Sequence, residues 1–330
     1  MKKIIALLLA VIMVMGLATV VSAETKGDAK PDTANTFVKK YTVVKGTAPA
    51  ETFDFGEATF VKFYDQYGAE VASDKVPATK PTITVGDAVF ADALTATDTA
   101  NVTVSVSDYE NVTLGKYVYS ITEVDQHTAG VTYNTKPMYL VVTISRDEES
   151  KQHYVAALHY ETEDGKKTGE LENVYNSGKL TVTKQITGNM ADMEKDFEFT
   201  IVLTAPAGDT IKSELTINVG NAAAEKDTPN AATKTYTYSI GDGESIVIDN
   251  IPAGVTYTIS EKNGDYKQTV TAGALTGDIA ANDDDKVEVT NDLTKEIDTG
   301  IVMDSVPFIV MAVIAVIGLA AFTAKKRVQE

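Results

Sequence analysis

The chain has 330 residues, with 29 Lys and Arg against 47 Asp and Glu, and a formal net charge of −18. Such an acidic chain is unsuited to binding nucleic acid, while its 44% of hydrophobic residues is enough to bury folded cores. Without Cys, and with only 3 His, it can form no disulfide or thiolate site, and we expect neither a metal nor a cofactor.

The first 23 residues have the features of a secretory signal peptide. A basic start, Met1-Lys2-Lys3, precedes a long apolar run, and the small-residue pattern Val21-Ser22-Ala23 ends it. We therefore expect cleavage between Ala23 and Glu24, export of the mature chain, and an N-terminal linker over residues 24–35.

Residues 36–295 are predicted to form short β-strands joined by turns. The strand segments alternate polar and apolar residues and are rich in Thr, Val and Tyr, while Gly, Asn, Asp and Pro mark the turns. This pattern is typical of immunoglobulin-like β-sandwiches, and the length fits two in tandem, so we expect an all-β fold. The predicted strands are 58–63, 102–106, 117–122, 138–144, 154–159, 180–186, 197–203, 234–240, 245–248, 255–260 and 287–290.

An internal repeat divides this region into two domains. The segments 40–53 and 184–197 align, with 13 residues from Lys to the first Phe in both; 115–123 aligns with 254–261, and 171–173 aligns more loosely with 289–291. We therefore expect domains over 36–176 and 177–295. Each contains Lys, Glu and Asn in the same order: Lys40, Glu123 and Asn173 in the first, and Lys184, Glu261 and Asn291 in the second.

The three polar residues of each repeat fall at core-facing positions of their strands. In the second repeat, strand alternation places Lys184 on the same face as Leu180 and Val182, and gives Glu261 and Asn291 apolar neighbours in the same way. Burial lowers the pKa of an amine and raises that of a carboxyl group, so a neutral lysine beside a protonated glutamic acid becomes feasible. The amine can then attack the Asn carboxamide while the acid polarises it and transfers the proton. A buried ion pair with Asn as a neighbour, or polar residues on edge strands, are the alternatives.

The first repeat offers two candidate lysines, Lys39 and Lys40. The 13-residue spacing and the facing of Val38 favour Lys40. The last strand of this repeat also departs from the pattern, because Gly169 occupies the first apolar position.

The C-terminal region, 296–330, combines a short motif, an apolar span and a basic tail. Residues 307–324 carry no charge and are long enough for a membrane helix, and Lys325-Lys326-Arg327 follows at once. The motif Glu296-Ile297-Asp298-Thr299-Gly300 stands just before the span. This order resembles the cell-wall sorting signal of Gram-positive surface proteins, although Glu-Ile replaces the usual Leu-Pro of the Leu-Pro-x-Thr-Gly core. The resemblance implies that a sortase cysteine attacks the carbonyl of Thr299 and releases the chain from Gly300 onward.

The repeated strand motifs resemble the isopeptide-linkage domains of Gram-positive pilins. They are an alternating apolar strand ending in Lys, a Tyr-containing strand ending in Glu, and a last strand ending in Asn, and the resemblance covers about residues 36–299. It implies bonds from Lys40 to Asn173 and from Lys184 to Asn291, assisted by Glu123 and Glu261. It also implies an exposed lysine that receives the Thr299 acyl group, and favours Lys166, with Lys167 as its neighbour, in the polar turn 161–169.

The resemblance as a whole implies a shaft subunit of a covalent surface pilus, secreted and displayed on a Gram-positive cell wall. Its expected partners are a sortase, other copies of the chain joined head to tail, and peptidoglycan or a basal pilin, with a host ligand left open. The chemistry is a single autocatalytic turnover, so no enzyme activity is expected; a wall-anchored glycosidase would need paired carboxylates in a cleft. The alternative is an adhesin or minor pilin that is anchored without being polymerised.

Overall fold

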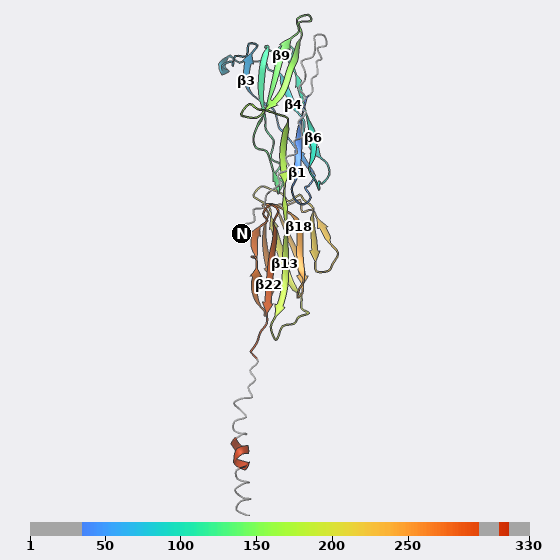
Figure 1. Cartoon of the computed structure of the whole chain (residues 1–330), viewed down its shortest axis with the longest axis vertical. Helices are drawn as coiled ribbons and strands as arrows, with labels where there is room; N and C mark the ends of the chain where they lie inside the picture. Colours follow the sequence, from blue (N-terminus) through green and yellow to red (C-terminus); the bar gives the residue numbers. More distant parts are fainter. Residues whose placement is uncertain (1–34, 297–309, 317–330) are drawn as a thin grey trace, which may run out of the picture.

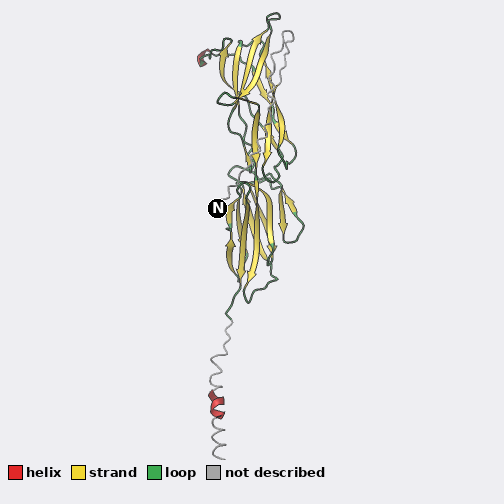
Figure 2. Cartoon of the chain, viewed as in Figure 1, coloured by secondary structure: helices red, strands yellow, loops and turns green. Residues whose placement is uncertain are grey.

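The computed structural model describes residues 35–296 and 310–316. Two β-sandwiches lie end to end along the long axis of the molecule (Figure 1), and strands with their connecting loops make up most of the described chain (Figure 2). No sheet in the described residues combines strands from both sides of Asn176. The expected all-β fold of two tandem β-sandwiches is therefore confirmed.

The N-terminal sandwich has two five-stranded sheets, ordered β4-β6-β1-β12-β8 and β11-β10-β9-β7-β3, and a small β2-β5 pair. Its strands are β1 (Asn35–Val43), β2 (Glu51–Phe53), β3 (Thr59–Asp65), β4 (Thr82–Val85), β5 (Ala88–Phe90), β6 (Asp98–Ser107), β7 (Gly115–Ile121), β8 (Val131–Thr132), β9 (Met138–Arg146), β10 (His153–Glu161), β11 (Lys167–Thr168) and β12 (Glu170–Tyr175), with a 3₁₀ turn η1 (Ser73–Lys75).

The C-terminal sandwich has a six-stranded sheet, β16-β15-β18-β13-β22-β20, and a four-stranded sheet, β17-β14-β19-β21. Its strands are β13 (Ser177–Thr187), β14 (Phe197–Thr204), β15 (Leu215–Val219), β16 (Glu225–Asp227), β17 (Thr233–Ile240), β18 (Ser245–Pro252), β19 (Thr256–Glu261), β20 (Lys267–Ala272), β21 (Thr276–Asp278) and β22 (Asp284–Asp292).

In both sandwiches the first strand pairs in parallel with the last. Strand β1 lies beside β12 in the N-terminal sandwich, and β13 lies beside β22 in the C-terminal one. Parallel neighbours so far apart in sequence require the whole domain to intervene between them. Any bond between these two strands therefore joins the entrance of a sandwich to its exit.

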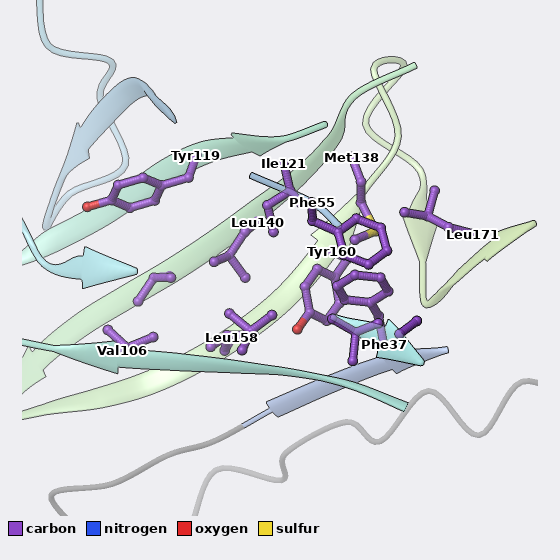
Figure 3. Close-up of a cluster of buried hydrophobic side chains, with 14 of the residues drawn as sticks. Phe37, Phe55, Val106, Tyr119, Ile121, Met138, Leu140, Leu158, Tyr160 and Leu171 are labelled. Atoms are coloured by element: carbon purple, nitrogen blue, oxygen red, sulfur yellow. The ribbon is translucent and has the colours of Figure 1, made fainter. Parts of the chain in front are cut away.

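Side chains that alternate inward from the facing sheets fill each core. In the N-terminal sandwich, Figure 3 shows Phe37 of β1 close to Phe55 and Tyr160. The ring of Phe37 meets that of Phe55 edge-on with centroids 5.0 Å apart, and that of Tyr160 at 5.3 Å. Such edge-to-face packing adds to the free energy gained by burying the rings.

Hydrogen bonds join the two sandwiches at their junction. The Asn250 side chain accepts a hydrogen bond from the backbone N–H of Thr47 at 2.9 Å and donates one to the Thr47 carbonyl at 2.9 Å. The Ser177 hydroxyl donates to the carbonyl of Lys45 at 3.0 Å, and the Lys45 ammonium pairs with Asp284 at 2.6 Å. The junction thus fixes the end of one sandwich against the other.

At the C-terminus, residues 310–316 form a short helix. None of the helices among the described residues is long and apolar enough to cross a membrane. The remainder of the predicted span 307–324 lies outside the described residues.

Candidate functional site

The strand register places a lysine and an asparagine at matching positions in both sandwiches. Asn173 lies opposite Tyr41, two residues beyond Lys39, and Asn291 lies opposite Ile186, two residues beyond Lys184. Side chains two residues apart on a strand share a face, so in each case Lys and Asn project into the same core. The repeat in the sequence thus corresponds to a repeat in the geometry.

In the N-terminal sandwich Lys39 is the lysine that lies in the core. The prediction that Lys40 occupies this position is wrong. The Lys39 ammonium lies 2.6 Å from a Glu123 oxygen and donates to Oδ1 of Asn173 at 2.7 Å. The Asn173 amide nitrogen donates to the second Glu123 oxygen. Lys40 points outward instead and pairs with the exposed Glu172 at 3.0 Å.

The facing of the neighbouring residues explains the difference. Phe37, Lys39 and Tyr41 are buried, whereas Val38 and Lys40 are only partly so. Because Phe37 and Tyr41 bury more apolar surface than Val38, they determine which face of β1 turns inward. The larger aromatic residues were the signal that could have identified Lys39 from the sequence.

In the C-terminal sandwich the predicted residues Lys184, Glu261 and Asn291 come together. The Lys184 ammonium lies 3.0 Å from Oε1 of Glu261, and the Asn291 amide nitrogen donates to the same oxygen at 3.0 Å. The side chains of Lys184 and Glu261 are fully buried, and Asn291 is 0% exposed. Oδ1 of Asn291 is buried without a hydrogen-bond partner in the described residues, so it is available to accept a proton or a hydrogen bond.

Burial favours the uncharged forms of three of these groups, Lys39, Lys184 and Glu123. Desolvation lowers the pKa of the Lys39 and Lys184 amines, and the neighbouring glutamates only partly oppose this. Desolvation likewise raises the pKa of the Glu123 carboxyl group, against the effect of Lys39. A neutral amine beside a protonated carboxylic acid is the combination that nucleophilic attack on an amide requires.

A phenylalanine ring lies against each lysine. The Lys39 nitrogen is 4.6 Å from the ring centroid of Phe53, and the Lys184 nitrogen is 4.5 Å from that of Phe197. These are the two phenylalanines that the repeat aligns, so the apolar wall of each site is also repeated. An aromatic wall excludes water and thereby strengthens every electrostatic interaction inside.

Sequence reasoning missed one residue of the C-terminal site, Gln268 of β20. Its side-chain nitrogen donates to Oε2 of Glu261 at 2.9 Å, and the strand pairing sets it opposite Asn291. Gln268 therefore orients the carboxyl group. No spacing in the sequence could reveal it, because β20 reaches the site only by pairing with β22.

The two candidate acceptor lysines lie at a tight turn between β10 and β11. The Lys166 side chain is 81% exposed and pairs with Asp164 at 2.6 Å, and Lys167 begins β11 and is also exposed. Gly165 has a φ of 75°, a left-handed conformation that glycine adopts at little cost. The turn therefore presents both amines to solvent. The predicted cleavage positions Ala23, Glu24, Thr299 and Gly300 lie outside the described residues.

Comparison with known proteins finds relatives among pilus proteins. A family model described as a domain of unknown function (DUF7601) matches residues 178–293. A protein named Pilin from Streptococcus pyogenes serotype M1 is 29% identical over 243 residues, which are 66% of this chain and 71% of that protein. A pilus tip adhesin, Cpa, from Streptococcus pyogenes is 32% identical over 93 residues, or 28% of this chain and 13% of the adhesin.

Among solved structures, a crystal structure of a mutant major pilin from Streptococcus pyogenes has a TM-score of 0.50 and 22% identity. The match covers 82% of this chain and 100% of that one. At this level of identity it shows a similarity of fold alone. The fold and the two repeated sites define a protein built of two β-sandwiches, each with a buried set of Lys, Glu and Asn. The relatives confirm the resemblance to Gram-positive pilins and support a pilus subunit.

Proposed function

We propose that this chain is the shaft subunit of a sortase-polymerised pilus, with one intramolecular isopeptide bond in each of the domains 36–176 and 177–295. The proposed bonds are Lys39–Asn173 and Lys184–Asn291, with Glu123 and Glu261 as the assisting acids. The observation that supports this most strongly is the buried Lys, Glu and Asn set, which occurs twice with the same strand offset.

Each bond forms by exchange of one amide for another. The neutral lysine Nζ attacks Cγ of the asparagine, and the protonated glutamic acid donates a hydrogen bond to the developing oxyanion at Oδ1. The glutamate then carries a proton from the attacking nitrogen to the departing amide nitrogen. A C–N bond forms, the original C–N bond breaks and one ammonia leaves, so atoms and charge balance without an oxidant or cofactor.

Polymerisation determines which of the two bonds carries force. With Lys166 joined to Thr299 of another subunit, tension enters at Lys166 and leaves through Thr299 of the same chain. The covalent route runs along the backbone from Lys166 to Lys184, crosses to Asn291, and continues to Thr299. The C-terminal bond therefore lies in the load path, and the N-terminal bond stabilises a sandwich beside it.

The proposed bonds are tested by intact mass measurement of the purified mature protein, residues 24–299. We expect a mass below that of the sequence by two molecules of ammonia, and the unmodified mass would refute both bonds. A loss of one ammonia would assign the failure to a single sandwich after peptide mapping.

Polymerisation is tested separately on cell-wall extracts. A ladder of high-mass species should disappear in a Lys166→Arg strain, since guanidinium is not a usable nucleophile at neutral pH. A Lys167→Arg strain is the matched control, and the double variant identifies a sortase that accepts either amine. An adhesin or minor pilin is the second candidate, supported by the similarity to a tip adhesin, and it predicts a single wall-anchored species without a ladder.

A further inference from the structure

A groove of about 290 Å³ crosses the outer face of the β11-β10-β9-β7-β3 sheet, next to the turn that carries Lys166. Val118 of β7 and Val141 of β9 form its floor, between Tyr64 and Tyr139. Strand pairing sets Lys62, Val118 and Val141 side by side across three strands. Gly165 lines the end of the groove nearest the turn.

The two valines of the floor are apolar residues on the side of the sheet that faces away from the core. Their chain neighbours Tyr117, Tyr119, Leu140 and Val142 belong to the hydrophobic core, whereas Val118 and Val141 do not. They are nevertheless only 5% and 2% exposed. A sheltered apolar strip of this kind is suited to receive one apolar side chain from an extended peptide.

Two lysines give this groove a basic side. Lys62 and Lys116 both line it. Lys62 also pairs with the exposed Glu70 at 3.8 Å, whereas Lys116 has no carboxylate partner within residues 35–296, its ammonium lying 5.5 Å from the Tyr64 ring centroid. Glu161 and Glu163 line the groove near the turn, and their negative charges offset those of the two lysines there. A second groove, of about 640 Å³, lies on the other side of the turn, but Glu163, Asp164 and Glu170 outnumber Lys136 there. An acidic peptide is therefore better suited to the first groove.

We propose that this groove binds the segment Glu296-Ile297-Asp298 of a second copy of the chain and so delivers its Thr299 to Lys166. Ile297 would cover Val118 and Val141, and the flanking carboxylates would face Lys62 and Lys116. The inference rests on the proposed role of Lys166 as acceptor. It adds that the subunit itself, and not the sortase alone, positions the incoming chain end.

The chain dimensions are consistent with this docking and exclude the same chain's own end. Ile297 is two residues from Thr299, or about 7 Å of extended chain, so a peptide in the groove brings Thr299 to the turn. Strand β22 leaves the C-terminal sandwich at the end opposite the N-terminal sandwich (Figure 1). The three residues beyond Glu296 span only about 10 Å, so the occupant must come from another subunit.

The absence of Cys allows docking to be tested by engineered disulfides, without sortase. Mature protein carrying Val61→Cys, at the 45% exposed rim of the groove, is mixed under mild oxidation with mature protein carrying Glu296→Cys. Val89→Cys, whose native side chain is 59% exposed on β5, replaces Val61→Cys in the control. We expect several times more heterodimer with Val61→Cys than with Val89→Cys, and equal yields would overturn the proposal.

Charge variants identify the groove. Adding Lys62→Glu and Lys116→Glu should lower the heterodimer yield about tenfold, because two attractive contacts become repulsive. The control pair Lys75→Glu and Lys136→Glu changes the net charge by the same amount and should leave the heterodimer yield unchanged. If only this control pair lowered the yield, the second groove would be the binding site and the proposal would be wrong.

Two readouts separate the docking proposal from the proposed function. Loss of two ammonia molecules in each variant shows that the sandwiches remain folded. Lys166→Arg should leave the heterodimer yield unchanged while abolishing the ladder in cells. If the ladder survives in the Lys166→Arg strain although the heterodimer still forms, Lys166 is not the acceptor. If the ladder is lost in that strain but the heterodimer does not form, only the groove is refuted.

Discussion

The proposed load path makes a mechanical prediction that distinguishes the two proposed isopeptide bonds. We compare pili of Glu261→Ala and Glu123→Ala strains, each of which should lack one bond while the other forms. Lys184 and Asn291 are 107 positions apart in the sequence. At about 3.5 Å per extended residue, unfolding of an unlinked C-terminal sandwich should lengthen each subunit by about 370 Å.

The Glu123→Ala pili should behave differently, although the missing bond spans 134 positions. Tension that enters at Lys166 passes along only 18 residues before it reaches Lys184. Extension of this segment can therefore lengthen the subunit by only about 60 Å. Wild-type pili should likewise show no step of several hundred ångströms.

Single-fibre force spectroscopy measures these steps directly, and intact mass of the corresponding monomers confirms that each variant lacks one bond. Steps of about 470 Å from Glu123→Ala pili would show that force crosses the whole N-terminal sandwich, and would contradict Lys166 as the point of entry. Glu261→Ala pili that do not lengthen would contradict either the role of Glu261 or the load path.

Three further predictions concern Lys39, Glu261 and the tyrosines whose pKa is raised by burial. Lys39→Met should lose only one ammonia while Lys40→Met loses two, as measured by intact mass, because only Lys39 lies beside Glu123 and Asn173; the reverse result would restore Lys40. Glu261→Gln should lower the free energy of unfolding of the C-terminal sandwich by about 5 kcal/mol in urea titrations, the chain-entropy value for a cross-linked loop of this length; a linked 184–291 peptide in tryptic maps of this variant would show that Glu261 is dispensable. The N-terminal sandwich should unfold first in alkali, because burial raises the pKa of six of its tyrosines, that of Tyr117 to about 12, against three tyrosines in the C-terminal sandwich. A raised folded-state pKa contributes stability below the unfolded value near 10 that is lost as the pH rises toward about 12. The absorbance change of these nine tyrosines should therefore accompany the loss of the native circular dichroism, and ionisation of all nine near pH 10 in a protein with native circular dichroism would contradict this.

Much of the C-terminal site could be predicted from the amino-acid order. Lys184, Glu261 and Asn291 each follow apolar residues at a period of two, and a strand with one apolar face has only one way to turn that face inward. The repeat then supplied the corresponding Glu123 and Asn173, which the structure brings into hydrogen-bond contact with each other.

The N-terminal lysine could not be predicted from spacing, because a shift of one residue reverses the facing of every side chain on a strand. Phe53 follows Lys39 by 14 positions, whereas Phe197 follows Lys184 by 13, so the first connection is one residue longer and the alignment selected the outward Lys40. The packing of Phe37 and Tyr41 in the core turns Lys39, and not Lys40, inward.

The groove beside Lys166 depends on tertiary structure alone. Lys62, Val118 and Val141 lie on three strands that are distant in sequence, and only the pairing of β3 with β7 and of β7 with β9 makes them neighbours. Sequence periodicity determines which side chains of one strand share a face, because that depends on local backbone geometry. Which strands lie side by side depends on how the whole chain packs its core. The local sequence pattern does not contain that information.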